Sequence, residues 1–518
     1  MDLTTEPQFK TADARKADLK RQSVRGGFIT VASQSFNFVL RTVSTIILAR
    51  LLTPDDFGLV AMVTAITGMA VMFQDMGLSL AAIQSKELTQ SQSSSLFWIN
   101  VVMGAIIGAI IVLISPFIGY FYNDQRVTVI TMAMASTFVI EGLAVQHCAL
   151  LKRQLRFSAL AAVQACAVCC GVVIAIILAH SGLGYWAIVW MTIAISFINM
   201  AGMWIVCRWF PGAPGQLNEI KKMLVFGTNV TGFNIVNYFA RNLDNMIIGK
   251  FCGGVSLGLY SKAYQIVLLP ISNLRMPLMT VAIPAMSKLQ DDAVLYREYC
   301  KKLLLALAFA GMPAVAFLYV CAEDVINLIF GPKWLAMVPV FQVLAIAAFL
   351  EPVTGMRGSV LVSLGKTRRY FWWGIGNAIS VAISFIIGVR WGMIGVAVSY
   401  TVTRYILLLP GTYFCFKDTP VRVRDFFGAI WQAALASLIM AFGMFFLERC
   451  FDLPSYQRIL ICLSMGVLIY TAVWLIFPEG LSRIREITGY GRLILNNKRS
   501  QPIIDSSLKN VEFRDGSV

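Results

Sequence analysis

IILARLLTPDDFGLV (residues 46–60) and MIIGKFCGGVSLGLY (residues 246–260) align without a gap, 200 residues apart. Further pairs of matching residues occur upstream at the same offset and downstream at an offset of 210. The matched positions are Gly27 and Gly227, Asn37 and Asn237, Arg41 and Arg241, Gly58 and Gly258, Glu141 and Glu351, His147 and Arg357, and Gly182 and Gly392. Repetition over this distance predicts two copies of one helical bundle within the chain.

The composition is typical of a membrane protein. Apolar residues make up 58% of the 518 residues and charged residues 14%, against about 45–50% and 25% in soluble domains. The net charge of +16 would suggest nucleic-acid binding in a soluble protein. Here the basic residues stand in short clusters between apolar runs, which is the pattern that orients a membrane protein. We therefore expect a multi-pass membrane protein with no nucleic-acid partner.

Apolar stretches long enough to span a bilayer recur about fourteen times along the chain. The predicted spans are 28–51, 57–78, 95–117, 127–149, 158–179, 185–207, 223–248, 257–286, 303–322, 335–363, 371–389, 391–415, 428–447 and 457–477. An even number puts both termini on one side, and most of the 43 Lys and Arg residues then fall on that side. Because positive loops face the cytoplasm, we predict a multi-pass membrane protein with both termini in the cytoplasm.

The predicted fold is all-α and polytopic, with two pseudo-symmetric six-helix lobes followed by two more helices. Its predicted parts are a cytoplasmic basic tail (1–24), an N-terminal lobe (25–210), a cytoplasmic linker (211–222), a C-terminal lobe (223–415), helices 13 and 14 (416–478) and a cytoplasmic tail (479–518). Because six is an even number, both copies begin on the same side of the membrane. Parallel repeats of this kind are typical of transporters.

Five arginines lie inside predicted spans, where each costs roughly 2.5–3.5 kcal/mol at the centre of the bilayer. They are Arg41, Arg241, Arg275, Arg357 and Arg404. We expect these side chains to face a watery cavity or a carboxylate. A helix-bracing ion pair is open for Arg241, three residues before Asp244, and for Arg357, which shares a predicted span with Glu351. Arg41 has no acidic residue in its own span.

A stripe of polar residues surrounds the first of these arginines. The stripe consists of Gln34, Asn37, Arg41 and Ser44, and its counterpart on the seventh span consists of Asn234, Asn237, Arg241 and Asp244. Steps of three and four residues place each set on one face of a helix. Two lobes with matched polar faces would line a central cavity, and the paired arginines would suit an anion.

Carboxyl groups within the spans are candidates for coupling transport to a proton or sodium gradient. They are Asp75, Glu141 and Asp244. No Walker-type phosphate loop occurs, and the eleven cysteines and two histidines show no metal-ligand spacing. We expect no catalytic residue, no metal and no cofactor.

Four segments carry a family resemblance: ARLLTPDDFGL (49–59), FQDMGLSLAAIQSKEL (73–88), SSLFWINVVMG (94–104) and LIFGPKW (328–334). Together they resemble the polysaccharide exporters of the multidrug/oligosaccharidyl-lipid/polysaccharide (MOP) superfamily, most closely the colanic-acid-exporter type of flippase. The resemblance runs from about residue 22 to residue 480. It implies a V-shaped pair of six-helix bundles, two additional helices, and cationic residues in a central cavity.

The resemblance also implies a function. It implies a flippase that moves an undecaprenyl-diphosphate-linked oligosaccharide repeat unit by alternating access, for exopolysaccharide or surface polysaccharide export. Arg41 and Arg241 best match the cavity cations of the family, whereas Arg275, Arg357 and Arg404 match only as cations within spans. The implied partners are the lipid-linked oligosaccharide, the lipid bilayer, and the polymerase and export proteins of the same pathway.

Two alternatives stay open. An ion-coupled drug or cation antiporter of the same superfamily would need an acidic cavity, and the arginines within the spans argue against one. A polysaccharide polymerase would need a large outer loop that holds catalytic groups, and the predicted outer loops are short.

Overall fold

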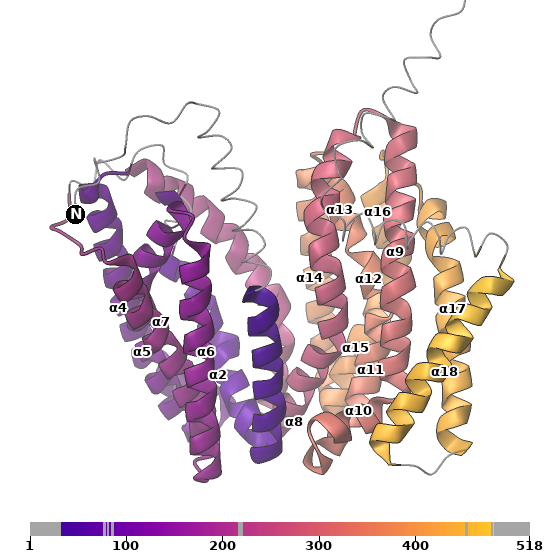
Figure 1. The fold of residues 1–518 in the computed structure, drawn as a ribbon, viewed down its shortest axis with the longest axis horizontal. Coiled ribbons are helices and arrows are strands. Elements are labelled where there is room, and N and C mark those ends of the chain that lie inside the picture. The colour runs from indigo at the N-terminus through magenta and orange to yellow at the C-terminus, as the bar shows by residue number, and fades with distance from the viewer. Residues whose placement is uncertain are drawn as a thin grey trace, which may run out of the picture. The chain divides into compact units, whose positions relative to one another are not determined.

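A computed structural model describes residues 33–75, 88–215, 221–450 and 454–477, with the single positions 79, 82, 83 and 480. All regular elements in these ranges are helices, and no strand occurs there (Figure 1). The described side chains exclude those of 75, 221–237, 239–241, 449 and 450. The predicted N-terminal tail lies outside the described residues, as does the predicted C-terminal tail apart from residue 480.

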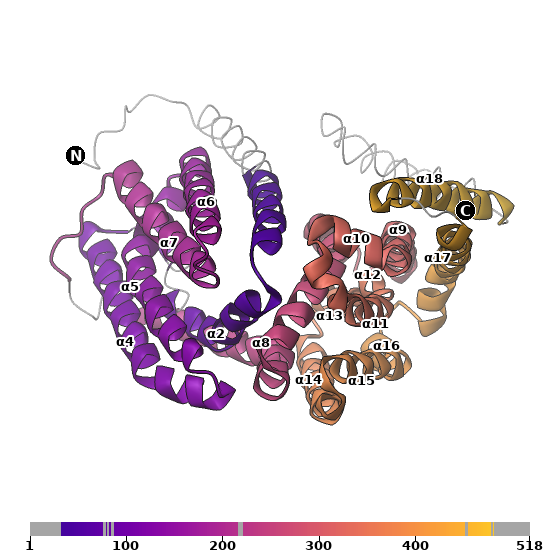
Figure 2. The same ribbon diagram turned by 90° about the horizontal axis from the view of Figure 1, so that it is seen from below.

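The first half of the chain forms long helices that follow the predicted spans. A helix over 33–51 is followed by α2 (Pro54–Asp75), α4 (Gln90–Tyr122), α5 (Gln125–Arg153), α6 (Phe157–His180) and α7 (Trp186–Cys207). Thr89 and Gln92 form a capping box at the start of α4, and the Asp124 side chain caps α5. α4 packs beside α5, and α6 packs beside α7 (Figure 2).

The second half is more often interrupted. Its helices are α8 (Lys221–Lys288), α9 (Ala293–Val320), α10 (Ala322–Ile329), the 3-10 turn η2 (Pro332–Met337), α11 (Val338–Ala348), α12 (Glu351–Thr354), α13 (Met356–Ser363), α14 (Thr367–Gly388), the 3-10 turn η3 (Val389–Trp391), α15 (Gly392–Ile406), α16 (Leu408–Phe416), α17 (Val423–Cys450) and α18 (Ser455–Ile476). The short helix α10 lies between the predicted spans 303–322 and 335–363, and η2 leads into the second of them.

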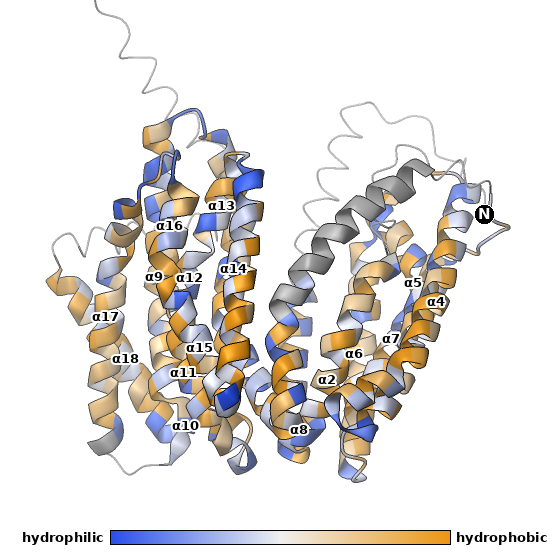
Figure 3. Ribbon diagram, turned by 180° about the vertical axis from the view of Figure 1, so that it is seen from behind, coloured by the Kyte–Doolittle hydropathy of each residue, from blue (hydrophilic) through white to orange (hydrophobic). Residues whose placement is uncertain are grey.

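Eleven described helical stretches are long and apolar enough to cross a membrane. Two of them, Asn242–Lys288 and Thr367–Ile406, contain 47 and 40 residues, about twice the 20 or so that one span requires. Each is broken at a glycine with positive φ, at Gly253 (81°) and Gly392 (72°), a conformation that favours glycine. With these breaks, the helix over 33–51 and the other helices of the structure overlap each of the fourteen predicted spans within the described residues. Hydrophobic positions dominate along the helices (Figure 3), and the all-α, polytopic fold is confirmed.

The described chain divides into two compact units, which we describe separately. The first unit comprises 1–265, 326–344 and 375–404, and the second unit comprises 266–325, 345–374 and 405–518. Each unit therefore combines stretches that are far apart in the sequence. The predicted lobe boundaries and the V-shaped arrangement stay predictions.

Within the first unit the two repeat segments pack directly against each other. A Cβ atom added to Gly58 would lie 1.8 Å from the carbonyl oxygen of Gly254, and one added to Gly258 would lie 1.9 Å from that of Pro54. The repeat offset relates Gly58 to Gly258 and Pro54 to Gly254, so the two contacts are equivalent. The two segments that the repeat relates therefore contact each other through equivalent residues. One segment is the start of α2, and the other is the second part of α8, which follows the break at Gly253.

The chain that leaves α7 runs along the start of α4. The backbone N–H groups of Gly212 and Gly215 donate to Ser94 Oγ at 2.9 Å and to Ser95 Oγ at 2.8 Å. We call residues 208–215 the strap. The first part of the predicted linker is therefore bound to the first unit, while residues 216–220 lie outside the described residues.

In the second unit, α17 and α18 pack against α9. Arg458 on α18 donates to the carboxylate of Asp324 on α10 at 2.7 Å, and Asp324 is 2% exposed. The Tyr470 hydroxyl donates to the carbonyl oxygen of Phe309 at 2.9 Å. The two predicted helices beyond the repeat therefore pack onto this unit.

Candidate functional site

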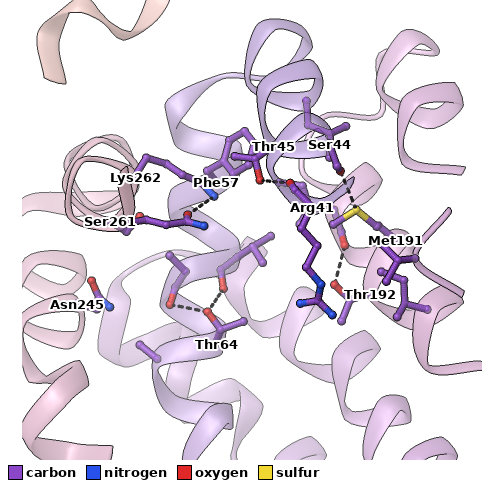
Figure 4. A pocket seen from close by; sticks show the side chains of 18 of the residues that line it. Arg41, Ser44, Thr45, Phe57, Thr64, Met191, Thr192, Asn245, Ser261 and Lys262 are labelled. Carbon is purple, nitrogen blue, oxygen red and sulfur yellow. Dashed lines mark hydrogen bonds between the residues drawn. The ribbon is translucent and has the colours of Figure 1, made fainter. Parts of the chain in front are cut away.

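The first unit contains a pocket of about 760 Å³ (Figure 4). Its walls come from the helix over 33–51 and from α2, α5, α6, α7 and α8. The polar residues that line it are Arg41, Ser44, Thr45, Thr64, Glu141, Thr192, Ser196, Tyr238, Asn242, Asn245, Ser261, Lys262 and Gln265. Two cations and one carboxylate thus share a lining that is otherwise neutral.

Arg41 points into this pocket (Figure 4). Steps of three and four residues place Ser44, Thr45 and Leu48 on the same helix face, and all three also line the pocket. The Arg41 side chain is exposed, and no described residue accepts a hydrogen bond from its guanidinium. A guanidinium in this state offers five N–H donors to an anion.

Lys262 on α8 lines the same pocket, although it was not among the predicted site residues. Its Nζ lies 4.6 Å from the centre of the Phe57 ring and 3.2 Å from Gln265 Oε1. In the sequence, Lys262 stands near the start of the predicted span 257–286 and is not one of the five arginines within spans. A helical face that starts at the repeated Gly258 and continues through Ser261, Lys262 and Gln265 could have identified it.

Glu141 on α5 is the carboxylate among the described pocket residues. Its Oε1 accepts a hydrogen bond from Ser196 Oγ on α7 at 3.0 Å. A carboxylate beside cations can balance one of them, or it can take up a proton or a sodium ion. One of the three predicted ion-coupling residues therefore lies in the same pocket as Arg41.

The other two predicted ion-coupling residues are not part of the described pocket. Asp244 is 6% exposed, and its carboxylate accepts from the Tyr260 hydroxyl at 3.2 Å and from the backbone N–H of Asn245 at 2.8 Å. The side chain of Asp75 lies outside the described residues. Among the residues that the structure describes, no group of three or more His, Cys, Asp and Glu could hold a metal ion.

The polar stripe predicted on the first span only partly reaches the pocket. Gln34 is exposed, and Asn37 donates from Nδ2 to Ser33 Oγ at 3.5 Å; neither lines the pocket. The side chains of Asn234, Asn237 and Arg241 lie outside the described residues. From α8, the side chains of Asn242, Asn245 and Gln265 contribute amide groups to the wall.

Arg357 lies in the second unit and is 6% exposed. Its Nε donates to the carbonyl oxygen of Thr354 at 3.1 Å, and its guanidinium stacks over the Trp373 ring at 5.2 Å. Nη1 of Arg357 also donates to the carbonyl oxygen of Leu407, at 3.5 Å. These contacts brace neighbouring helices, through carbonyl groups and a ring rather than through the predicted carboxylate. A role for Arg357 in substrate binding stays a prediction.

Arg275 and Arg404 also lie away from the pocket. In the second unit, a Cβ atom added to Gly355 would fall 2.0 Å from Cζ of Arg275, so this guanidinium packs on glycine backbone. In the first unit, Arg404 lies 5.8 Å from the centre of the Tyr400 ring. Their predicted substrate contacts stay predictions.

Aromatic packing backs one end of the pocket. The ring of Phe57, which lines the pocket, meets the ring of Trp334 edge-on at 5.5 Å between centroids. The Trp334 indole donates to the carbonyl oxygen of Ala49 at 2.8 Å, and Arg50 donates to that of Leu328. The segment around η2 is therefore bound to the end of the helix over 33–51.

An ion-pair cluster joins α5 to the start of α2 at the same end. Arg126 lies 2.7 Å from the carboxylate of Asp124 and 2.8 Å from that of Asp55. The hydrogen bond from Arg126 lowers the pKa of the Asp124 carboxyl below its usual value. This cluster depends on an ionised Asp124.

Solved membrane proteins share this arrangement of helices. The chain is similar to the lipid II flippase MurJ in an inward closed conformation, with a TM-score of 0.69 and 14% sequence identity, over 86% of this chain and 98% of that one. The likeness defines the class of fold, a helical membrane protein built like MurJ. Residues 47–339 match the family model of polysaccharide biosynthesis proteins, and the chain belongs to this family. The family resemblance seen in the sequence is thereby confirmed.

Two curated relatives extend over most of the chain. The teichuronic acid biosynthesis protein TuaB of Bacillus subtilis (strain 168) is 27% identical over 461 residues, which cover 87% of this chain and 95% of TuaB. The succinoglycan biosynthesis transport protein ExoT of Rhizobium meliloti (strain 1021) is 22% identical over 466 residues, which cover 88% of this chain and 93% of ExoT. Both names belong to polysaccharide pathways, and one of them specifies transport.

Proposed function

We propose that the chain is a flippase that moves an undecaprenyl-diphosphate-linked oligosaccharide repeat unit across the cytoplasmic membrane by alternating access. The product would supply exopolysaccharide or surface polysaccharide export. The observation that carries the proposal is the pocket of the first unit, where Arg41 and Lys262 come from different helices to one polar space. The names of TuaB, ExoT and MurJ support the proposed pathway and the proposed mode of transport.

The chemistry of the lining fits a diphosphate attached to a sugar. Guanidinium binds phosphate oxygens in a bidentate way, whereas ammonium acts as a compact point charge. Arg41 and Lys262 would bind the diphosphate in these two modes. The hydroxyl of Ser44 and the amides of Asn242 and Asn245 would bind sugar hydroxyls, and the polyprenyl chain would remain in lipid.

Glu141 is the proposed coupling site for a proton or a sodium ion. It faces the same pocket as the two cations and is held by Ser196. Binding of an ion at Glu141 would change the net charge of the pocket and with it the affinity for an anionic substrate. Transport would then need no nucleotide and no catalytic residue in this chain.

The cellular setting follows from the same proposal. The chain would lie in the inner membrane with both termini in the cytoplasm. It would receive lipid-linked repeat units from enzymes on that side and deliver them to the polymerase and export proteins of the pathway.

Analysis of lipid-linked sugars by leaflet tests the proposal. In a strain that lacks the gene, complete repeat units should accumulate in the cytoplasmic leaflet, out of reach of an impermeant periplasmic glycosidase. Repeat units that reach the outer leaflet but stay unpolymerised would instead identify a polymerase. Re-expression of the wild-type chain must restore export.

Glu141 is also the observation that favours the second candidate, an ion-coupled drug or cation antiporter. Such a protein would bind cationic substrates at the carboxylate. Resistance to cationic dyes that falls with loss of the gene, while the leaflet distribution of lipid-linked sugars stays normal, would favour the antiporter.

A further inference from the structure

A second pocket, of about 630 Å³, lies in the second unit at the turn between α13 and α14. Lys366, Arg368 and Arg369 line it, together with Trp372 and Phe414. The helical stretches on either side of this turn each qualify as membrane spans. The turn between two spans lies at the membrane surface, so this cationic pocket is placed at the height of the lipid headgroups.

The turn has a defined conformation. Gly365 adopts a φ of 68°, and the backbone N–H of Lys366 donates to the carbonyl oxygen of Leu361 at 2.8 Å. This is the left-handed glycine ending that closes many helices. The pocket is therefore shaped by fixed backbone.

Two of the cations are already anchored to the chain that follows α16. The Lys366 ammonium donates to the carbonyl oxygen of Asp418, and Arg369 donates to that of Lys417. Arg369 also pairs with the Asp418 carboxylate at 3.0 Å. The Asp418 carboxylate thus balances Arg369, and the three basic residues of the lining leave the pocket with net positive charge.

Arg368 is different, because none of the described residues pairs with it. Its side chain is exposed, and no described residue accepts a hydrogen bond from it. A guanidinium that stays free beside two anchored cations is available to an external anion, and phosphate is the anion that its planar fork suits best.

The aromatic residues indicate what the anion is attached to. Trp372, one helical turn beyond Arg368, is 57% exposed, and Phe414 is 42% exposed. Exposed aromatic side chains next to charged ones are typical of the membrane interface, where they contact the glycerol and upper acyl region of lipids. A soluble phosphate would make no use of these rings.

We propose that this pocket binds the headgroup of an anionic phospholipid, with Arg368 on the phosphate and Trp372 and Phe414 against the lipid backbone. The charge distribution predicts the cytoplasmic side for this turn, and basic pockets between spans on that side suit anionic headgroups. The site lies in a different unit from the pocket around Arg41, so the proposal stands independently of the transported substrate.

Lipid titration of the purified full-length protein tests the proposal. Native mass spectrometry in detergent would measure binding of phosphatidylglycerol to the wild type and to R368Q, R368K and W372A. R368Q should bind about fivefold more weakly, the effect of about 1 kcal/mol for one basic residue at an anionic surface. R368K should retain most of the affinity, and W372A should lose part of it.

R424Q is the matched control, because Arg424 is exposed, lies in the same unit and lines neither described pocket. It should bind phosphatidylglycerol like the wild type, and all variants should keep the wild-type melting temperature. Equal binding by R368Q and wild type would overturn the proposal, as would equal binding of phosphatidylcholine. Displacement of the lipid by millimolar inorganic phosphate would also overturn it, because the site would then be one for a free anion.

Discussion

The two cations of the first-unit pocket differ in how their surroundings hold them. Arg41 is exposed to the pocket and has no described partner, whereas Lys262 is held over the Phe57 ring and near Gln265. Arg41 can therefore turn toward an anion at little cost in packing. Lys262 is preorganised, and its charge is already partly balanced by the ring face.

We predict that R41A and K262A each lower polysaccharide export by roughly ten- to a hundredfold, since each removes a charge-assisted contact of about 1.5–3 kcal/mol. R41K should recover part of the activity but not the bidentate contact. Export is measured in the complemented deletion strain at matched protein levels. K333A is the control, because Lys333 is exposed and does not line the pocket. Full export by R41A would remove Arg41 from the substrate site.

A second residue-scale prediction concerns Glu141. E141Q keeps the shape of the side chain and its hydrogen bond with Ser196 but cannot carry a negative charge. We expect substrate binding to persist while transport no longer responds to an imposed proton or sodium gradient. The measurement is lipid-linked sugar transport into proteoliposomes with and without each gradient. Gradient-dependent transport by E141Q would exclude Glu141 as the coupling site.

The cluster around Arg126 predicts a pH-dependent stability. Because Arg126 lowers the pKa of Asp124, the pair stabilises the folded state above the unfolded pKa of about 3.9 and stops doing so as pH falls through the lowered folded pKa. The melting temperature of R126Q should therefore lie below that of the wild type at pH 7, and the gap should shrink below about pH 4. R390Q, which changes an exposed arginine, should show no such gap. A gap that is constant with pH would rule out this cause.

At the scale of elements, the contact between α2 and the second part of α8 is one of backbone against backbone. Backbone meets backbone where Gly58 and Gly258 lie, so neither position has room for a side chain. Close approach of this kind is a known use of glycine between membrane helices. It also fixes the spacing of the walls that carry Phe57 and Lys262.

We predict that G258A lowers the free energy of unfolding by about 1–3 kcal/mol, because the added methyl group must push two backbones apart. Thermal unfolding of the purified protein in detergent measures the effect. G428A is the control, since Gly428 lies in α17 with nothing within 4 Å of an added Cβ. It should be neutral or stabilising by up to about 1 kcal/mol, because alanine favours helices. If G258A unfolds at the same temperature as the wild type, the two backbones do not approach closely at Gly258.

Most elements could be predicted from the sequence, because span length and hydropathy are local properties. The break between the seventh and eighth spans was predicted, and it falls at Gly253. The strap could not be predicted, since its bonds to Ser94 and Ser95 use backbone groups that carry no sequence pattern. Lys262 stands near the start of a predicted span, and it is its helical phase, rather than its position along the span, that brings it into the pocket.

At the scale of the whole molecule, the distribution of charge predicts which side each turn faces. Turns at 123 and 182 should be outside, and turns at 155 and 365 should be inside. Alkaline phosphatase, which is active only outside the cytoplasm, should be active when fused at the first two turns and inactive at the others. The reverse pattern would invert the predicted topology and would place the pocket at Arg368 on the outer face.

The reciprocal glycine contact has a consequence for how the molecule holds together. Its form is that of an isologous interface, in which two partners offer each other the same surface. Between separate chains such an interface obeys mass action and dissociates on dilution. Within one polypeptide the second copy is always present at a high effective concentration, so the contact between the two repeat segments need not be strong enough to hold separate chains together.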